Sequence, residues 1–277
     1  MQHDNNFALP NQINMRKPLI TFTGMLMVAT LSLSAQINEG IITYTRTVKF
    51  KFNGPPQFQP PGSGGEQVRK QNLELLFSGK QSLLRNIAEQ AEQSEEEGPV
   101  QIRIIGPGSD QLEVFTDLTT KKTSSLRELG AKEYVVDDTL KNENWKITAE
   151  TKNILGYTCH KATAERITWR KQMMFIDGNP TMDSILDTLQ YVAWYADGFG
   201  CNSGPEAAGA LPGMILEYDF DNGKVHIVAT AVTTKVKTKE IVAPKGKHIT
   251  AAEYKALEAD FRRKMMEQRG MPPPPKD

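Results

Sequence analysis

The sequence has few cysteines and no excess of charge of either sign. Only 2 Cys occur in 277 residues, which excludes a disulfide-dense scaffold and a multi-cysteine zinc or iron–sulfur protein. Lys and Arg together number 33, as do Asp and Glu, so the formal net charge is zero. A nucleic-acid-binding domain usually carries a strong positive excess, and we therefore expect no nucleic-acid partner. Hydrophobic residues make up 39% of the chain, which is typical of a folded globular protein.

Motifs of common catalytic and metal sites are also missing. The chain has no Gly-x-Ser-x-Gly segment and no phosphate-binding glycine loop followed by Lys-Ser or Lys-Thr. After the N-terminal segment, three histidines remain, and they are far apart in the sequence with no His-x-x-x-His pair: His160, His226 and His248. We therefore expect no enzymatic activity, no cofactor and no bound metal.

Residues 1–35 are expected to form a secretory signal segment. Arg16 and Lys17 supply a positive start, and the apolar run from Leu19 to Leu33 ends before the small residue Ala35, where cleavage is expected. The run is about 15 residues long, shorter than the ~20 that span a bilayer. No Cys follows it, as one would in a bacterial lipoprotein. The protein should be periplasmic or secreted, without a transmembrane span after cleavage; the alternative is an uncleaved anchor.

Alternation of apolar and polar residues dominates the next part of the chain. Between Ile42 and Phe52 nearly every second residue is large and apolar, which predicts a long half-buried strand. The clearest hairpin joins 214–220 to 225–236 through Asp221-Asn222-Gly223, since these residues tolerate positive φ. About ten strand-like runs predict that residues 36–249 form a mainly β domain. It should be a single strongly curved antiparallel sheet or a partly open barrel.

One helix and one tail are expected at the C-terminal end. Thr250 and Glu253 form a Thr-x-x-Glu capping box. Apolar residues at helical spacing follow it, which predicts a helix over 250–270. Residues 271–277 include four consecutive prolines and should be disordered. At the other end, Met15 lies directly before the basic pair and is an alternative start.

The two cysteines are expected to form a disulfide. Cys159 and Cys201 follow a signal-like segment, and two lone cysteines in an exported protein most often pair; unpaired or redox-active thiols are the alternative. A bridge would order the glycine-rich stretch 198–213, whose end, Leu211-Pro212-Gly213, is interpreted as a type II turn. His160 is adjacent to Cys159, but neighbouring side chains of a strand point to opposite faces. We therefore expect no site that the two share.

Several segments resemble the GLPGLI family, exported proteins of Bacteroidetes. The main resemblance is to the family signature, with Ala and Met at its first and fifth positions: Ala210, Leu211, Pro212, Gly213, Met214 and Ile215. Ile154 to Thr163, Ala193-Trp194-Tyr195 and Gly204-Pro205 resemble further family elements in the same order. The resemblance extends from about Ile41 to Val236. It implies export, a β-rich curved sheet and no known cofactor; the family has no established activity.

Aromatic residues recur on one expected face of the sheet. They form the candidate apolar ligand face: Tyr44, Phe50, Phe52, Tyr191, Tyr195, Tyr218 and Phe220. We expect a non-enzymatic binding or assembly protein of the cell envelope, in which this face holds an apolar ligand or a segment of an outer-membrane partner. The alternative is that the same aromatics fill a closed core under the C-terminal helix.

Two other functional hypotheses remain open. A glycan-binding or glycan-hydrolysing protein would use Trp169 or Trp194 as a sugar platform. Glu217 and Asp219, about 7 Å apart at strand rise, would be its acids. A Cu(I)-binding protein would instead use soft methionine thioethers. The candidate methionines are Met173, Met174, Met265, Met266 and Met271.

Overall fold

The structure is a computed structural model, and it describes residues 36–51, 66–87, 111–141, 143–176 and 179–268. All of them belong to one of the two units into which the chain divides, Ala35–Asp277. The expected signal segment, Phe52 and the proline tail lie outside the described residues.

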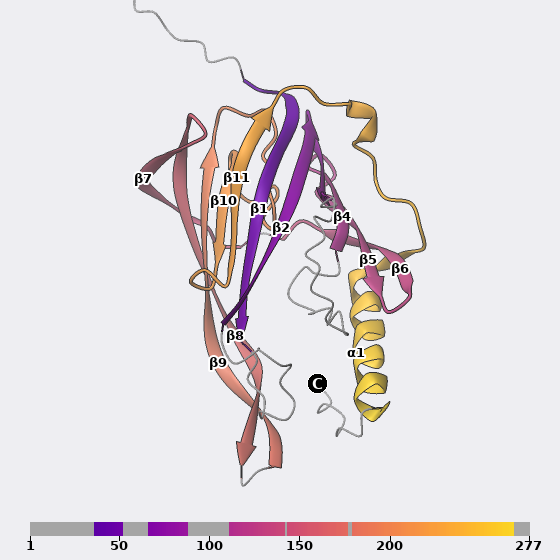
Figure 1. The fold of residues 1–277 in the computed structure, drawn as a ribbon. Coiled ribbons are helices and arrows are strands. Elements are labelled where there is room, and N and C mark those ends of the chain that lie inside the picture. The colour runs from indigo at the N-terminus through magenta and orange to yellow at the C-terminus, as the bar shows by residue number, and fades with distance from the viewer. Residues whose placement is uncertain (1–35, 52–65, 88–110, 142, 177–178, 269–277) are drawn as a thin grey trace, which may run out of the picture. The chain divides into compact units, whose positions relative to one another are not determined.

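The described residues fold mainly as strands, and the strands form one sheet that is not closed (Figure 1). In spatial order the strands are β12 (His248–Thr250), β6 (Lys132–Thr139), β5 (Lys122–Leu129), β4 (Gln111–Asp117), β3 (Gln81–Asn86), β2 (Glu66–Ser78), β1 (Glu39–Lys51), β11 (Val225–Thr233), β10 (Met214–Phe220), β9 (Asn179–Ala196), β8 (Tyr157–Ile176) and β7 (Lys146–Ile154). The prediction of a mainly β domain, as a single curved sheet or a partly open barrel, is confirmed: the structure has one sheet, and that sheet is not closed. The sheet is antiparallel except at one edge, where β12 pairs with β6 in parallel. This exception arises because β12 reaches that edge through a long connection from β11, which includes the short 3-10 helix η2 (Thr238–Glu240).

Local sequence patterns account for the strands and turns as observed. On β1, Ile42 and Tyr44 are fully buried while Thr43 between them is partly exposed, as the alternation predicts. The turn between β10 and β11 has positive φ at each of its three central residues, with values of 52°, 57° and 82° for Asp221, Asn222 and Gly223. These residues tolerate that conformation, so the hairpin register follows from the local sequence.

A loop of the chain, residues 197–213, covers the aromatic side of the sheet. Phe199, Cys201 and Leu211 of this loop are buried within the main hydrophobic cluster. The Phe199 ring lies 5.9 Å from the ring of Phe77 on β2 and 4.9 Å from that of Tyr157 on β8. The loop therefore seals the core that strands β1, β2 and β8 to β11 form.

The C-terminal helix α1 (Ala251–Gln268) packs elsewhere, against the β5–β6 end of the sheet. The expected capping box is formed: Glu253 accepts the backbone N–H of Thr250 at 2.7 Å, and the Thr250 hydroxyl accepts that of Glu253 at 3.2 Å. The buried Tyr254 ring lies edge-on to Tyr134 of β6, 6.3 Å away. The alternative expectation is thus wrong about the helix, which follows β12 to the far edge of the sheet, but the aromatic side chains do fill a core.

Candidate functional site

The two cysteines are free and buried, and they do not form the expected disulfide. Each thiol has its own neighbours: Cys159 Sγ lies 3.6 Å from the carbonyl oxygen of Tyr157, and Cys201 Sγ lies 3.9 Å from that of Gln81. Burial raises the pKa of both thiols to about 11. The expectation is corrected because each thiol lies against a different carbonyl group, that of Tyr157 on β8 for Cys159 and that of Gln81 on β3 for Cys201.

Backbone hydrogen bonds order the glycine-rich loop in place of a disulfide. Ile37 donates to the carbonyl of Gly198 at 2.9 Å and accepts from the N–H of Gly200 at 2.8 Å. Further along, the carbonyl of Ser203 accepts the N–H of Ile215 at 2.8 Å, and its hydroxyl lies 2.7 Å from that of Ser82. The first half of the loop is therefore fixed to the segment before β1 through Gly198 and Gly200 and to the start of β10 through Ser203.

The family-like segment 210–215 has a packing role at the start of β10. A Cβ on Gly213 would lie 2.3 Å from the carbonyl oxygen of Ala196 on β9, so only glycine fits there without a shift. Gly213 does not have positive φ, and the interpretation as a type II turn is therefore wrong. Leu211, Met214 and Ile215 are buried at 4%, 0% and 1% exposure. The segment lets β10 pair closely with β9 and places three apolar side chains in the core.

The expected apolar ligand face is filled by the protein itself. Tyr44, Tyr191, Tyr195 and Tyr218 belong to the main hydrophobic cluster and are at most 6% exposed. Phe220 is packed against the same cluster. Phe50 is partly exposed, and Phe52 lies outside the described residues. The four tyrosines therefore form a core beneath the 197–213 loop and do not offer an open apolar surface.

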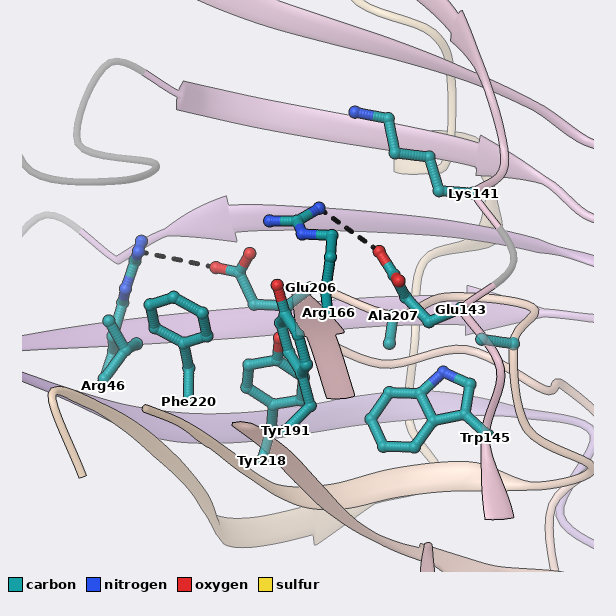
Figure 2. A pocket seen from close by; sticks show the side chains of 12 residues that line it. Arg46, Lys141, Glu143, Trp145, Arg166, Tyr191, Glu206, Ala207, Tyr218 and Phe220 are labelled. Carbon is teal, nitrogen blue, oxygen red and sulfur yellow. Dashed lines mark hydrogen bonds and ion pairs between the residues drawn. The ribbon is translucent and has the colours of Figure 1, made fainter. Parts of the chain in front are cut away.

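A pocket with a volume of about 230 Å³ opens at the margin of this core (Figure 2). Strands β1 and β8 to β11 contribute to its wall, together with the segment before β7 and the 197–213 loop. The lining residues are Arg46, Lys141, Glu143, Trp145, Arg166, Tyr191, Glu206, Ala207, Ala210, Tyr218, Phe220 and Val225. The pocket thus combines aromatic rings from the sheet with five charged residues from four separate segments.

Two ion pairs lie on the charged side of the pocket. Arg46 of β1, which is only 6% exposed, approaches Glu206 of the loop at 3.5 Å. Arg166 of β8 approaches Glu143 at 3.4 Å, and its guanidinium lies over the Tyr191 ring, 5.6 Å from the ring centre (Figure 2). Both arginines occupy positions on the core face of their strands, so they hold the two carboxylates against the aromatic side chains.

The aromatic side of the pocket contains two buried polar atoms without a hydrogen-bond partner among the described residues. They are the hydroxyl of Tyr191 and the indole Nε1 of Trp145. The two rings meet edge-on at 6.4 Å, and the Tyr191 ring lies 5.2 Å from that of Phe220. Burial raises the pKa of the Tyr191 phenol, although the nearby Arg166 acts in the opposite direction. Buried polar groups are nearly always hydrogen-bonded, so these two atoms distinguish the pocket from the rest of the core.

The residues of the glycan hypothesis lie apart from this pocket. Trp194 is on the opposite face of the sheet, where the Lys152 ammonium stands 4.2 Å from its ring centre. Glu217 accepts a hydrogen bond from Lys152 at 2.6 Å. Asp219 instead accepts the backbone N–H of Gly223 at 2.9 Å within the β10–β11 turn. The two carboxylates therefore have separate structural partners.

The remaining tryptophan of that hypothesis, Trp169, is 68% exposed on the β8–β9 hairpin. It pairs with Leu186 across the hairpin, and the neighbouring Ile167 is also exposed. These three side chains form a small apolar surface. It is separate from the pocket because the Tyr191 and Arg166 side chains belong to the other face of the same strands.

The residues considered for metal binding are dispersed. Each histidine approaches a different carboxylate: His160 lies near Asp197, His226 near Glu217 and His248 near Asp137. Within the described ranges, no three His, Cys, Asp or Glu side chains are grouped so that they could hold a metal ion. Of the methionines considered for Cu(I), Met173 and Met174 are on β8 and Met265 and Met266 on α1, while Met271 lies outside the described residues.

The sequence interpretation named Tyr191, Tyr218 and Phe220 of the pocket, as parts of an apolar ligand face, but assigned none of its charged residues to a site. The one local signal among the charged residues is Arg46, which interrupts the apolar face of β1. No comparable signal marks Arg166, Glu143 or Glu206, since charged residues are common on strands and loops.

In the part of the chain that the structure describes, no helix has the length and hydropathy to span a bilayer.

Comparison with known proteins identifies a family of unknown function. The model of that family, Porph_ging, matches residues 145–217, which include Trp145, Arg166, Tyr191 and Glu206 of the pocket. No match was found among the curated proteins. Two solved structures of PNGF-II, in space groups C2 and P21, are similar at 16% identity and a TM-score of 0.48 and cover 81% and 82% of this chain. The chain spans about a third of their length, 33% and 34%. The chain is therefore similar, over residues 145–217, to a family whose function is not known.

Proposed function

We propose that this protein is a non-enzymatic binding protein of the cell envelope and that the pocket beside Arg166 and Tyr191 holds a small polar ligand. The observation that carries the proposal is that the buried Tyr191 hydroxyl and the buried Trp145 Nε1 have no hydrogen-bond partner of normal geometry among the described residues, with the Arg166 guanidinium close enough to Tyr191 to act on its hydroxyl. Leaving such a group unsatisfied costs about 1–3 kcal/mol. A ligand that accepts hydrogen bonds from both atoms would recover that free energy, which favours a bound state.

The size and filling of the core support a small polar ligand over an acyl chain. The tyrosines of the expected apolar face are already buried against the 197–213 loop. The pocket volume of about 230 Å³ lies below the range of about 300–1,000 Å³ typical of drug-sized ligands. The ligand should therefore be of the size of a single sugar or amino acid derivative.

The envelope location is supported by the sequence of the N-terminal segment. Arg16, Lys17 and the apolar run that ends before Ala35 have the order and length of a cleavable export signal. Fractionation of the native host, followed by N-terminal sequencing, tests this part of the proposal. We expect the protein in the periplasmic or secreted fraction with a new N-terminus near Gln36; an intact chain in the cytoplasm would refute it.

The binding proposal is tested by native mass spectrometry of the protein purified from its own envelope. The wild-type protein should carry a small molecule. Ala207→Phe, which places a bulky side chain in the pocket wall, should lose it, whereas Ala252→Phe on the exposed face of α1 should retain it. Circular dichroism and melting establish that both variants are folded. A wild-type protein without any adduct, or an adduct retained by Ala207→Phe, would refute the proposal.

A further inference from the structure

The hydrogen-bonding groups that the pocket leaves unused are donors. The indole Nε1–H of Trp145 can only donate, and a phenol such as that of Tyr191 can donate as well as accept. A guanidinium has five N–H donors, and among the described residues Arg166 forms an ion pair through its Nη1 with Glu143. These donors favour a ligand that has oxygen atoms able to accept hydrogen bonds.

The charges of the pocket favour an anionic acceptor. The lining residues include the cations Arg46, Lys141 and Arg166 but only the carboxylates Glu143 and Glu206. Each carboxylate is already paired with an arginine. The lining residues by themselves sum to one positive unit, which a ligand with one negative charge would neutralise; the cation in excess, Lys141, is exposed and also lies 3.8 Å from Asp138 outside the lining. Coulomb attraction at a partly desolvated site is stronger than in bulk water.

We propose that the pocket recognises the carboxylate of a small organic acid, with Arg166, Tyr191 and Trp145 as its donors. The inference rests on the proposed function and names the chemical class of its ligand. The three side chains are neighbours in the pocket wall: the Arg166 guanidinium lies 5.6 Å from the Tyr191 ring centre, and the centres of the Tyr191 and Trp145 rings lie 6.4 Å apart. Arginine suits this role because its planar fork matches a carboxylate in two parallel hydrogen bonds.

The remainder of the ligand would lie along the aromatic side of the pocket. Phe220 and Tyr218 line that side, and Phe220 is in contact with the Tyr191 ring. The apolar ring edges there can contact carbon atoms of a sugar ring or of an amino acid side chain. Two sources of the carboxylate thus share one recognition chemistry, a sugar acid and an N-acylated amino acid, and the probes below distinguish them.

The test compares acids with their neutral counterparts by isothermal titration calorimetry on ligand-free protein. The first probe pair is glucuronate and glucose, and the second is N-acetylphenylalanine and its amide. We expect the acid of one pair to bind at least tenfold more tightly than its neutral counterpart, and we expect added NaCl to weaken that binding. The pair that responds identifies the source.

Variants assign the binding to the named donors. Arg166→Gln should weaken acid binding at least tenfold and remove the difference between acid and neutral probe. Tyr191→Phe should weaken it about fivefold, the effect of one hydrogen bond. The matched controls are Lys161→Gln, an ion-paired cation on the outer face of the same strand β8, and Tyr195→Phe, a buried tyrosine of β9 outside the pocket. Both controls should bind within twofold of wild type.

The outcomes separate this inference from the proposed function. Equal binding of acids and neutral probes, or acid binding that survives Arg166→Gln, would overturn the carboxylate inference. A neutral co-purifying compound that Ala207→Phe displaces, with no binding of either acid, would also overturn it and would leave the pocket as a binding site. If no probe binds and no adduct depends on Ala207, both the inference and the proposed function fail.

Discussion

Replacing Tyr44 by phenylalanine should destabilise the protein by removing one buried hydrogen bond. The Tyr44 side chain is fully buried, and its hydroxyl donates to the carbonyl of Ile215 at 2.8 Å. That carbonyl lies next to a bulge, where the register of β10 against β9 shifts between Ile215 and Glu217. The hydrogen bond therefore ties β1 to the irregular start of β10 across the intervening strand β11.

The magnitude follows from the burial of the acceptor. A typical hydrogen bond contributes about 1 kcal/mol net, but leaving a buried acceptor unsatisfied costs about 1–3 kcal/mol. Ile215 is only 1% exposed, so water cannot replace the lost hydroxyl. We expect Tyr44→Phe to lower the free energy of unfolding by about 2 kcal/mol. For a domain of this size, that change corresponds to a melting temperature about 4–8 °C lower.

Urea denaturation and thermal melting of Tyr44→Phe beside Tyr218→Phe measure the effect. Tyr218 is also a buried core tyrosine, but its hydroxyl makes no hydrogen bond to the described residues, so its loss should cost less than about 0.5 kcal/mol. An unchanged stability of Tyr44→Phe would refute the reasoning. An equal loss in both variants would also refute it, because the effect would then come from the phenol in general.

Three further outcomes are expected. A thiol reagent should modify neither Cys159 nor Cys201 in the folded protein and both after unfolding. Since burial raises the pKa of both thiols from 9.0 to about 11, the native state keeps protons that the unfolded state releases, and the free energy of unfolding should fall as the pH rises from 9 to 11. Rapid modification of the folded protein, or the absence of free thiols after denaturation, would contradict the expectation that both cysteines are free and buried. Gly213→Ala should cost about 1–3 kcal/mol in urea denaturation, because its Cβ would overlap the Ala196 carbonyl; full stability would disprove the close approach. Thr250→Ala should destabilise α1 by about 1 kcal/mol, seen as faster amide hydrogen exchange in its first turn, and unaltered exchange would show that the cap is dispensable.

Local patterns in the sequence were sufficient to predict the strands, the β10–β11 turn and the cap of α1. The period-two burial of Ile42 and Tyr44, the positive φ values at 221–223 and the Thr250–Glu253 capping box all depend on neighbours within a few positions. Steric and hydrogen-bonding preferences at that range are properties of the residues themselves. The same preferences predict a single sheet or a partly open barrel, since short turns join most consecutive strands, and the structure shows that the sheet is not closed.

Only the tertiary structure decided which side chains meet. Arg46 and Glu206 are paired although 160 positions separate them, and Trp145 reaches Tyr191 only because the order β9–β8–β7 brings the segment before β7 to that side of the sheet. Cys159 and Cys201, which the export context alone suggested would pair, are both free and buried. Strand order and the path of a covering loop depend on the packing of the whole core. The residues adjacent to a given residue in the chain do not determine that packing. The pocket is therefore formed by the fold and is not marked by any sequence motif.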